Sequence, residues 1–143
     1  MMAVLKRDHQ ELSILSSGAI GTGHWVLKEA IETKTLYKVY LPCGSEIFSK
    51  FWKDEQISEL QRFLSSPYCR GMFTHGNVYT QENIDERNKK IIEDCNILIV
   101  FWLGRMRGET YNSIKHALNK GKQVFNAYDE SVVQLEMSDL RGI

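Results

Sequence analysis

The chain has 143 residues, of which 43% are hydrophobic and 25% are charged, and these values predict one globular domain over residues 1–143. Its 18 basic and 18 acidic side chains give a formal net charge of zero, which argues against nucleic-acid binding through a basic surface. The three cysteines and four histidines are dispersed and no apolar run approaches membrane-spanning length, so we expect a cytoplasmic protein without metal, cofactor or membrane anchor.

The first half of the chain shows alternating strand and helix patterns. The expected elements are strand Leu12–Ser16, turn Gly18–Gly23, helix His24–Thr33, strand Leu36–Leu41 and helical segment Glu46–Leu64. Apolar residues recur at helical spacing in the first helix, and the second strand alternates in polarity. Lys53, Asp54 and Glu55 interrupt the apolar spacing of the last segment, which favours two short helices there.

The second half repeats this alternation. The expected elements are a loop Ser65–Asn77 with a short strand Gly71–Thr74, a helix from its N-cap Thr80 to about Asp94, strand Ile97–Trp102, helix Glu109–Asn119 ended by Gly121, and strand Gln123–Ala127. The segment Tyr128–Ile143 has no clear pattern. Strands that alternate with helices predict an α/β, Rossmann-like fold with a mostly parallel sheet and helices on both faces.

Two glycine-rich turns each follow an apolar run and precede a helix. The first is Gly18–Gly23 and the second is Gly104–Gly108, which also carries Arg105 and Arg107. A helix start and the backbone N–H groups of such a turn favour an anion, and a guanidinium grips phosphate. The alternatives are a plain tight turn and two solvated loop arginines. We expect both turns at one sheet edge, where α/β proteins bind ligands.

The turn ILSSGAIGTG and the block RNKKIIEDCNILIVFWLGRMRGETYNSIKHALNKGKQV resemble the SMF/DprA–LOG (SLOG) superfamily. The resemblance covers most of the chain. It implies a Rossmann-like domain that holds a ribose phosphate, as in Lonely Guy phosphoribohydrolases, DNA-processing proteins and sensors of nucleotide-derived signals related to ADP-ribose. The chain departs from the family pattern at Ser17, at the pair Gly23–His24, and at Glu109, which is inserted before Thr110.

Several further side chains are candidates for the site. The resemblance implies that Glu109 assists N-glycosidic cleavage, although its shifted spacing favours an ordinary acid in the first helical turn. Arg87 and Asn88 lie mid-helix and contact either a ligand or a neighbouring loop. Trp102 is expected in the core, with base stacking as the alternative. The expected ligand-binding set is Ser16, Ser17, Gly18, Gly21, Thr22, Gly23, Arg87, Asn88, Trp102, Gly104, Arg105, Arg107, Gly108 and Thr110. His24 is expected to be partly exposed.

These residues support two functions of different classes. The first is a non-catalytic module that senses or sequesters a small nucleotide or an ADP-ribose-like signal. The second is an N-glycosidase acting on a nucleoside or nucleotide, with Glu109 assisting. DNA processing is disfavoured by the neutral charge. We also expect a homodimer or higher homo-oligomer, because the aromatic residues near one helical region exceed the needs of one face: Phe48, Phe51, Trp52 and Phe63.

Overall fold

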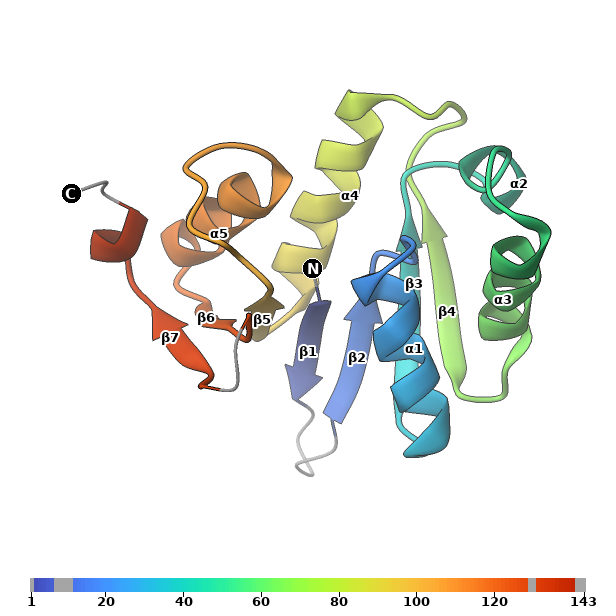
Figure 1. Ribbon diagram of the computed structural model, residues 1–143, viewed down its shortest axis with the longest axis horizontal. Helices are drawn as coiled ribbons and strands as arrows, with labels where there is room; N and C mark the ends of the chain where they lie inside the picture. Colours follow the sequence, from blue (N-terminus) through green and yellow to red (C-terminus); the bar gives the residue numbers. More distant parts are fainter. Residues whose placement is uncertain (1, 7–11, 129–130, 141–143) are drawn as a thin grey trace.

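The computed structural model describes residues 2–6, 12–128 and 131–140. These residues form a seven-stranded sheet in the order β4-β3-β2-β1-β5-β6-β7 (Figure 1). The strands are β1 Met2–Lys6, β2 Leu12–Ser16, β3 Leu36–Leu41, β4 Cys69–Thr74, β5 Ile97–Val100, β6 Gln123–Asn126 and β7 Val133–Leu135.

The sheet is mixed rather than mostly parallel: among the described strands, three pairings are parallel and three are antiparallel. β2, β3 and β4 pair in parallel, and so do β5 and β6. β1 is antiparallel to both of its neighbours, β2 and β5, and β7 is antiparallel to β6. It follows that β2 and β5 run in the same direction and that their carboxyl ends lie at the same edge of the sheet.

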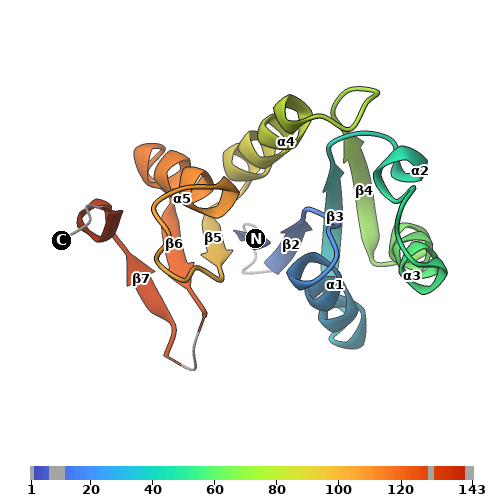
Figure 2. The ribbon, with the colours of Figure 1, turned by 45° about the horizontal axis from the view of Figure 1, so that its top comes forward.

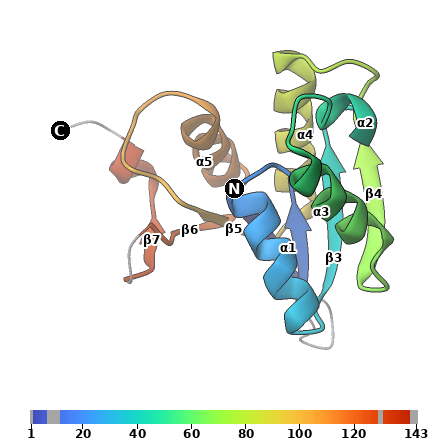
Figure 3. The same cartoon turned by 45° about the vertical axis from the view of Figure 1, so that its right-hand side comes forward.

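Helices cover both faces of the sheet. α1 (Thr22–Glu32) and α3 (Asp54–Ser65) pack on the side of β2, β3 and β4, whereas α4 (Gln81–Asp94) and α5 (Glu109–Asn119) lie on the opposite face (Figures 2 and 3). The two faces hold separate apolar clusters, one around Leu27 and Phe63 and the other around Leu98 and Ile114. The expected Rossmann-like α/β architecture is therefore present.

Local signals in the sequence mark where several helices begin or end. The helical segment after β3 divides into α2 (Ser45–Phe48) and α3, and Gln56 Oε1 accepts a hydrogen bond from the Lys53 backbone N–H at 3.0 Å. Thr80 caps α4 by accepting from the Asn83 N–H at 3.2 Å. Gly121, with φ of 74°, follows α5. A 3₁₀ helix, η1 (Met137–Leu140), comes after β7.

Three strand ends differ from expectation: β4 begins at Cys69 rather than Gly71, β6 ends at Asn126 rather than Ala127, and β5 stops at Val100 rather than Trp102. Beyond Val100 the side chain of Asn126 takes the place of a partner strand: its Oδ1 accepts from the Trp102 N–H at 3.0 Å, and its Nδ2 donates to the Trp102 carbonyl at 2.9 Å. These two bonds satisfy the backbone of Trp102 without continuing the sheet.

The strand β1 was not predicted, and it changes the centre of the sheet. In a doubly wound sheet the ligand crevice lies where the strand order reverses, here between β2 and β5. β1 stands between them. Since neighbouring strands lie about 4.8 Å apart, the ends of β2 and β5 are about 10 Å apart rather than adjacent, which widens the crevice.

Among the described residues, no helix is long and apolar enough to cross a membrane.

Candidate functional site

Both glycine turns begin helices at this sheet edge. Gly21 precedes α1 with φ of 92° and Gly108 precedes α5 with φ of 96°, and neither helix has a side-chain cap. The His24 N–H donates to the Ala19 carbonyl at 3.0 Å. Within the described residues the N–H groups of Thr22 and Gly23 in α1, and of Glu109 and Thr110 in α5, have no such partner and are open to an anion. The two strand–turn–helix segments are also in contact. The rings of Trp25 in α1 and Phe101 after β5 pack edge to face, with 6.4 Å between their centroids. The prediction that both turns lie at one edge is confirmed.

The first turn is tightly folded against the sheet. Ser16 Oγ donates to the Gly23 carbonyl at 3.1 Å and accepts from the Gly18 N–H at 3.2 Å. Gly18 has φ of 68°, and a Cβ there would lie 2.8 Å from Leu41 Cδ2. Ser16 and Gly18 thus shape the turn, and other residues face the space beside it.

A cavity of about 330 Å³ lies beside the first turn and the start of α5, and no residue of Gly104–Gly108 lines it. Its walls come from the first turn, the start of α5, the middle of α4, and aromatic side chains that follow β3 and β4. The lining residues are Ser17, Ala19, Ile20, Phe48, Trp52, Tyr79, Ile84, Arg87, Asn88, Glu109 and Thr110. The cavity therefore combines helix starts, one cation, one carboxylate and three aromatic rings.

Arg87 supplies the cation and is only 5% exposed. Its Nη1 donates to the carbonyls of Ser17 at 2.8 Å and Tyr40 at 3.2 Å, and its Nε donates to Asn88 Oδ1 at 2.8 Å. Burial lowers the pKa of Arg87, and the nearby Glu109 opposes this effect; an arginine nevertheless stays charged in proteins.

One nitrogen of this guanidinium is unused. Within the described part of the chain, Arg87 Nη2 has no hydrogen-bond partner, and it is not among the fully enclosed polar atoms without a partner, which are Ser13 Oγ and His116 Nε2. Nη2 therefore keeps some accessible surface, and the Arg87 side chain lines the cavity. A buried cation with a spare donor is suited to hold an anionic ligand.

Asn88 links this arginine to Glu109. Asn88 accepts from Arg87 through Oδ1, and its Nδ2 donates to Glu109 Oε1 at 2.8 Å. This explains an asparagine in the middle of a helix, where its propensity is modest: it bridges α4 to the first residue of α5. The chain Arg87–Asn88–Glu109 holds a carboxylate at a fixed place on the cavity wall.

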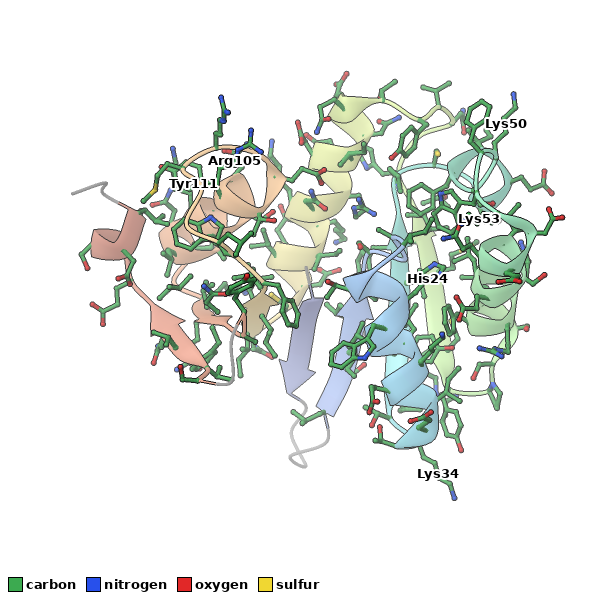
Figure 4. The ribbon with its side chains drawn as sticks, viewed as in Figure 1. His24, Lys34, Lys50, Lys53, Arg105 and Tyr111 are labelled. Atoms are coloured by element: carbon green, nitrogen blue, oxygen red, sulfur yellow. The ribbon has the colours of Figure 1, made fainter. Side chains whose placement is uncertain are left out.

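The structure gathers part of the expected set in the cavity. Of the fifteen residues predicted for the site, the lining contains Ser17, Arg87, Asn88, Glu109 and Thr110. The remaining residues of the first turn shape its backbone. Those of the second turn lie on the loop between β5 and α5; Arg105 and Arg107 are exposed there and do not line the cavity. Figure 4 shows Arg105 on this loop, above α5.

Trp102 has a structural position, as the core interpretation predicts. It is 8% exposed and belongs to the cluster beneath α5. Its Nε1 donates to the Arg105 carbonyl at 2.9 Å, so the indole anchors the loop that carries both arginines. The base-stacking alternative lacks support here, because the indole does not line the cavity.

The expectation of a partly exposed His24 is wrong. His24 is 5% exposed, with Nε2 3.0 Å from the Gly18 carbonyl and Nδ1 3.3 Å from Glu59 Oε2. Its ring packs edge to face against Trp52 and Phe63, and Figure 4 shows it extending from α1 toward α3. The packing of α3 against α1, which local pattern does not reveal, encloses it.

The aromatic part of the cavity was missed by sequence reasoning. Phe48 and Trp52, for which the sequence indicates only an oligomer interface, line the cavity together with Tyr79. The interface itself stays a prediction. Phe63 is fully buried and Phe51 is 92% exposed. Their position in the sequence could have indicated this role, because these rings follow the carboxyl ends of β3 and β4, at the same edge as the two glycine turns.

The part of the chain that the structure describes contains no group of three or more His, Cys, Asp or Glu residues placed to hold a metal ion. Comparison of the sequence with protein-family models finds no match, and no curated protein matches it significantly.

Proposed function

We propose that the cavity binds a small phosphate-bearing nucleotide or ADP-ribose-like signal, and that the protein acts as a sensor or sequestering module for it. One observation carries this proposal: the cavity brings the uncapped start of α5 and the glycine turn before α1 together with Arg87, whose Nη2 is unpartnered. The resemblance of both segments to the SLOG superfamily supports the same ligand class.

The charges favour an anion. Each helix start carries about half a positive charge, and Arg87 adds a full one. The guanidinium is held by three hydrogen bonds, so little side-chain entropy is lost when it binds. Glu109 offsets part of this charge, and a phosphate is best accommodated nearer to Ser17 and the start of α1 than to that carboxylate.

A second candidate is an N-glycosidase, and the Asn88–Glu109 hydrogen bond favours it. A carboxylate fixed by an amide on the cavity wall can stabilise the positive charge that develops on ribose as the base departs, or transfer a proton. Most glycosidases use two carboxylates, and Glu109 is the one acidic residue in the cavity lining. Binding without turnover therefore remains the primary proposal.

Thermal shift and calorimetry with ribose 5-phosphate, AMP and ADP-ribose test the binding proposal. Ile20→Asp is the blocking variant, because Ile20 lines the cavity, is 44% exposed and lies beside the start of α1, where an acid does not destabilise the helix. Ile47→Asp, at a 46% exposed position outside the lining, is the matched control. We expect stabilisation of the wild type and Ile47→Asp by at least one compound, and its loss in Ile20→Asp.

The proposal fails if none of the compounds binds at millimolar concentration, or if both aspartate variants bind as the wild type does. Product analysis separates the two functions. Intact nucleotide after prolonged incubation supports a binder. Steady release of free base, abolished in Glu109→Gln with binding retained, would establish the glycosidase.

A further inference from the structure

We propose that the ligand is a single nucleotide whose aromatic base lies against the wall formed by Phe48, Trp52 and Tyr79, here called the aromatic wall. This inference rests on the proposed function, since it assigns the non-phosphate end of the same ligand. It narrows the ligand class to purine nucleoside monophosphates.

The three rings are in contact but are not coplanar. The centroid of the Phe48 ring lies 5.0 Å from that of Trp52, with 64° between the ring planes, and 5.6 Å from that of Tyr79, with 43° between the planes. Trp52 in turn packs edge to face on the buried His24, 5.2 Å away. Phe48 is 8% exposed and packs in the core beneath α1 and α3. The core therefore supports Phe48 and Trp52 from behind, and a flat base can stack on one ring of the aromatic wall while it meets the others at an angle.

Tyr79 leaves much of its ring available. It is 55% exposed although it contacts Phe48. Tyr79 and Arg87 line the same cavity. An exposed ring at a cavity mouth, beside the cation, is the arrangement in which a base stacks while its phosphate meets a positive charge.

The size of the cavity limits the ligand to one nucleotide. Its volume of about 330 Å³ is at the lower end of the roughly 300–1,000 Å³ typical of ligand sites. A base on the aromatic wall and a phosphate at the helix starts leave room for one ribose between them. A second cavity of about 330 Å³ lies between α4 and α5, but Asn88 and Glu109 line both, and their hydrogen bond separates the two spaces. A longer ligand must displace it or extend into solvent.

Purines are favoured over pyrimidines because the larger ring system of a purine covers more of an exposed ring such as that of Tyr79. Outside the aromatic wall, the hydrogen-bonding side chains of the lining are Ser17, Arg87, Asn88, Glu109 and Thr110. All of these lie on the side of the helix starts and α4, and the wall itself offers the Trp52 indole N–H and the Tyr79 hydroxyl. We therefore infer recognition by stacking, with weak discrimination between adenine and guanine.

Calorimetric titration with AMP, UMP, ribose 5-phosphate and ADP-ribose tests this inference. We expect AMP to bind about tenfold more tightly than ribose 5-phosphate, as stacking of one base implies. Tyr79→Ala should weaken AMP binding about tenfold and leave ribose 5-phosphate binding within twofold. Tyr128→Ala is the matched control, because Tyr128 is 58% exposed and outside the cavity lining. It should change neither affinity.

Fluorescence supplies a second readout that a purely structural role of the rings would not produce. AMP should quench the emission of Trp52, and ribose 5-phosphate should not. In Trp52→Phe the quenching should disappear, while the emission of Trp25 and Trp102 stays unchanged on titration. A circular dichroism spectrum and melting curve confirm that each variant is folded.

The outcomes separate this inference from the proposed function. Equal affinities for AMP and ribose 5-phosphate, or equal weakening of both by Tyr79→Ala, would overturn the base assignment and leave the phosphate site standing. ADP-ribose binding more than tenfold tighter than AMP would overturn the single-nucleotide limit. If no phosphate compound binds the folded wild type, the proposed function itself fails, and this inference fails with it.

Discussion

Asn88 Nδ2 donates a hydrogen bond to Glu109 Oε1 at 2.8 Å, and this bond joins the middle of α4 to the first residue of α5 at the wall of the cavity. The other end of the same amide accepts from Arg87 Nε. One side chain thus fixes both charged groups of the site, so their spacing is set before any ligand arrives.

Removal of this amide should destabilise the protein. In Asn88→Ala the Nε of Arg87 loses its acceptor while the arginine stays buried, and an unsatisfied buried donor costs about 1–3 kcal/mol. Chemical denaturation of the wild type and the variant measures the difference. Asn112→Ala is the control, because Asn112 is exposed on α5; we expect about 0.5 kcal/mol or less there. Equal stability of the Asn88→Ala variant and the wild type would contradict the bridging role.

Gly18→Ala, which adds one methyl group, should strongly lower the free energy of unfolding. Gly18 has φ of 68°, and an added Cβ would meet Leu41 Cδ2 at 2.8 Å. The left-handed backbone costs about 1–2 kcal/mol for alanine and overpacking about 1–3 kcal/mol. We therefore expect a loss of about 2–4 kcal/mol in the free energy of unfolding.

Gly44→Ala provides the comparison for this prediction. Gly44 has φ of −54° and no atom within 4 Å of an added Cβ, so alanine should leave stability within about 0.5 kcal/mol or raise it slightly. A loss at Gly18 no larger than that at Gly44 would show that the first turn is not as tightly packed as the structure indicates.

Glu59 should make stability depend on pH on the acid side. A hydrogen bond from Lys28, followed by one from His24, holds the pKa of Glu59 below its ordinary value. Because the folded-state pKa is the lower one, the stabilisation is complete above the unfolded-state pKa of the group. It is lost as pH falls through the folded-state pKa. The side chain of Lys28 is 50% exposed, so the effect is about 1 kcal/mol or less.

Melting curves of the wild type and Glu59→Gln across acidic pH test this prediction. The wild type should be more stable near neutral pH, and the difference should shrink as the solution is acidified below the usual range of a glutamate. Glu55→Gln, at an exposed position of α3, is the control. A difference that grows on acidification would reverse the sign and refute the assignment.

The two arginine positions should respond differently in nucleotide binding. Arg87→Lys removes the planar donor set that holds two carbonyls and faces the cavity, so we expect at least a tenfold loss of affinity for a bound phosphate compound. Arg105→Ala should leave the affinity within twofold, because Arg105 is exposed and does not line the cavity. Calorimetry on the folded variants measures both affinities. A larger loss of affinity in Arg105→Ala than in Arg87→Lys would indicate that the phosphate binds at the second turn.

Much of the fold was predictable because it depends on local pattern. The strands Leu12–Ser16 and Leu36–Leu41 and the helix Glu109–Asn119 have the bounds that periodicity predicts. The placement of both glycine turns at one sheet edge follows from the same alternation of strand and helix. In contrast, β1 pairs with β2 and with the distant β5, and its few residues carry no periodic signal of that pairing.

The sequence by itself determined the alternating elements, the parallel core of the sheet and the uncapped helix starts, because each depends on residues a few positions apart. Only the tertiary structure decided which arginine meets the cavity. Arg87 reaches the carbonyls of Ser17 and Tyr40, 70 and 47 residues away, whereas Arg105 and Arg107, beside the glycines, remain in solvent. The burial of His24 and the assembly of the aromatic wall likewise depend on packing between distant segments, which local pattern does not encode.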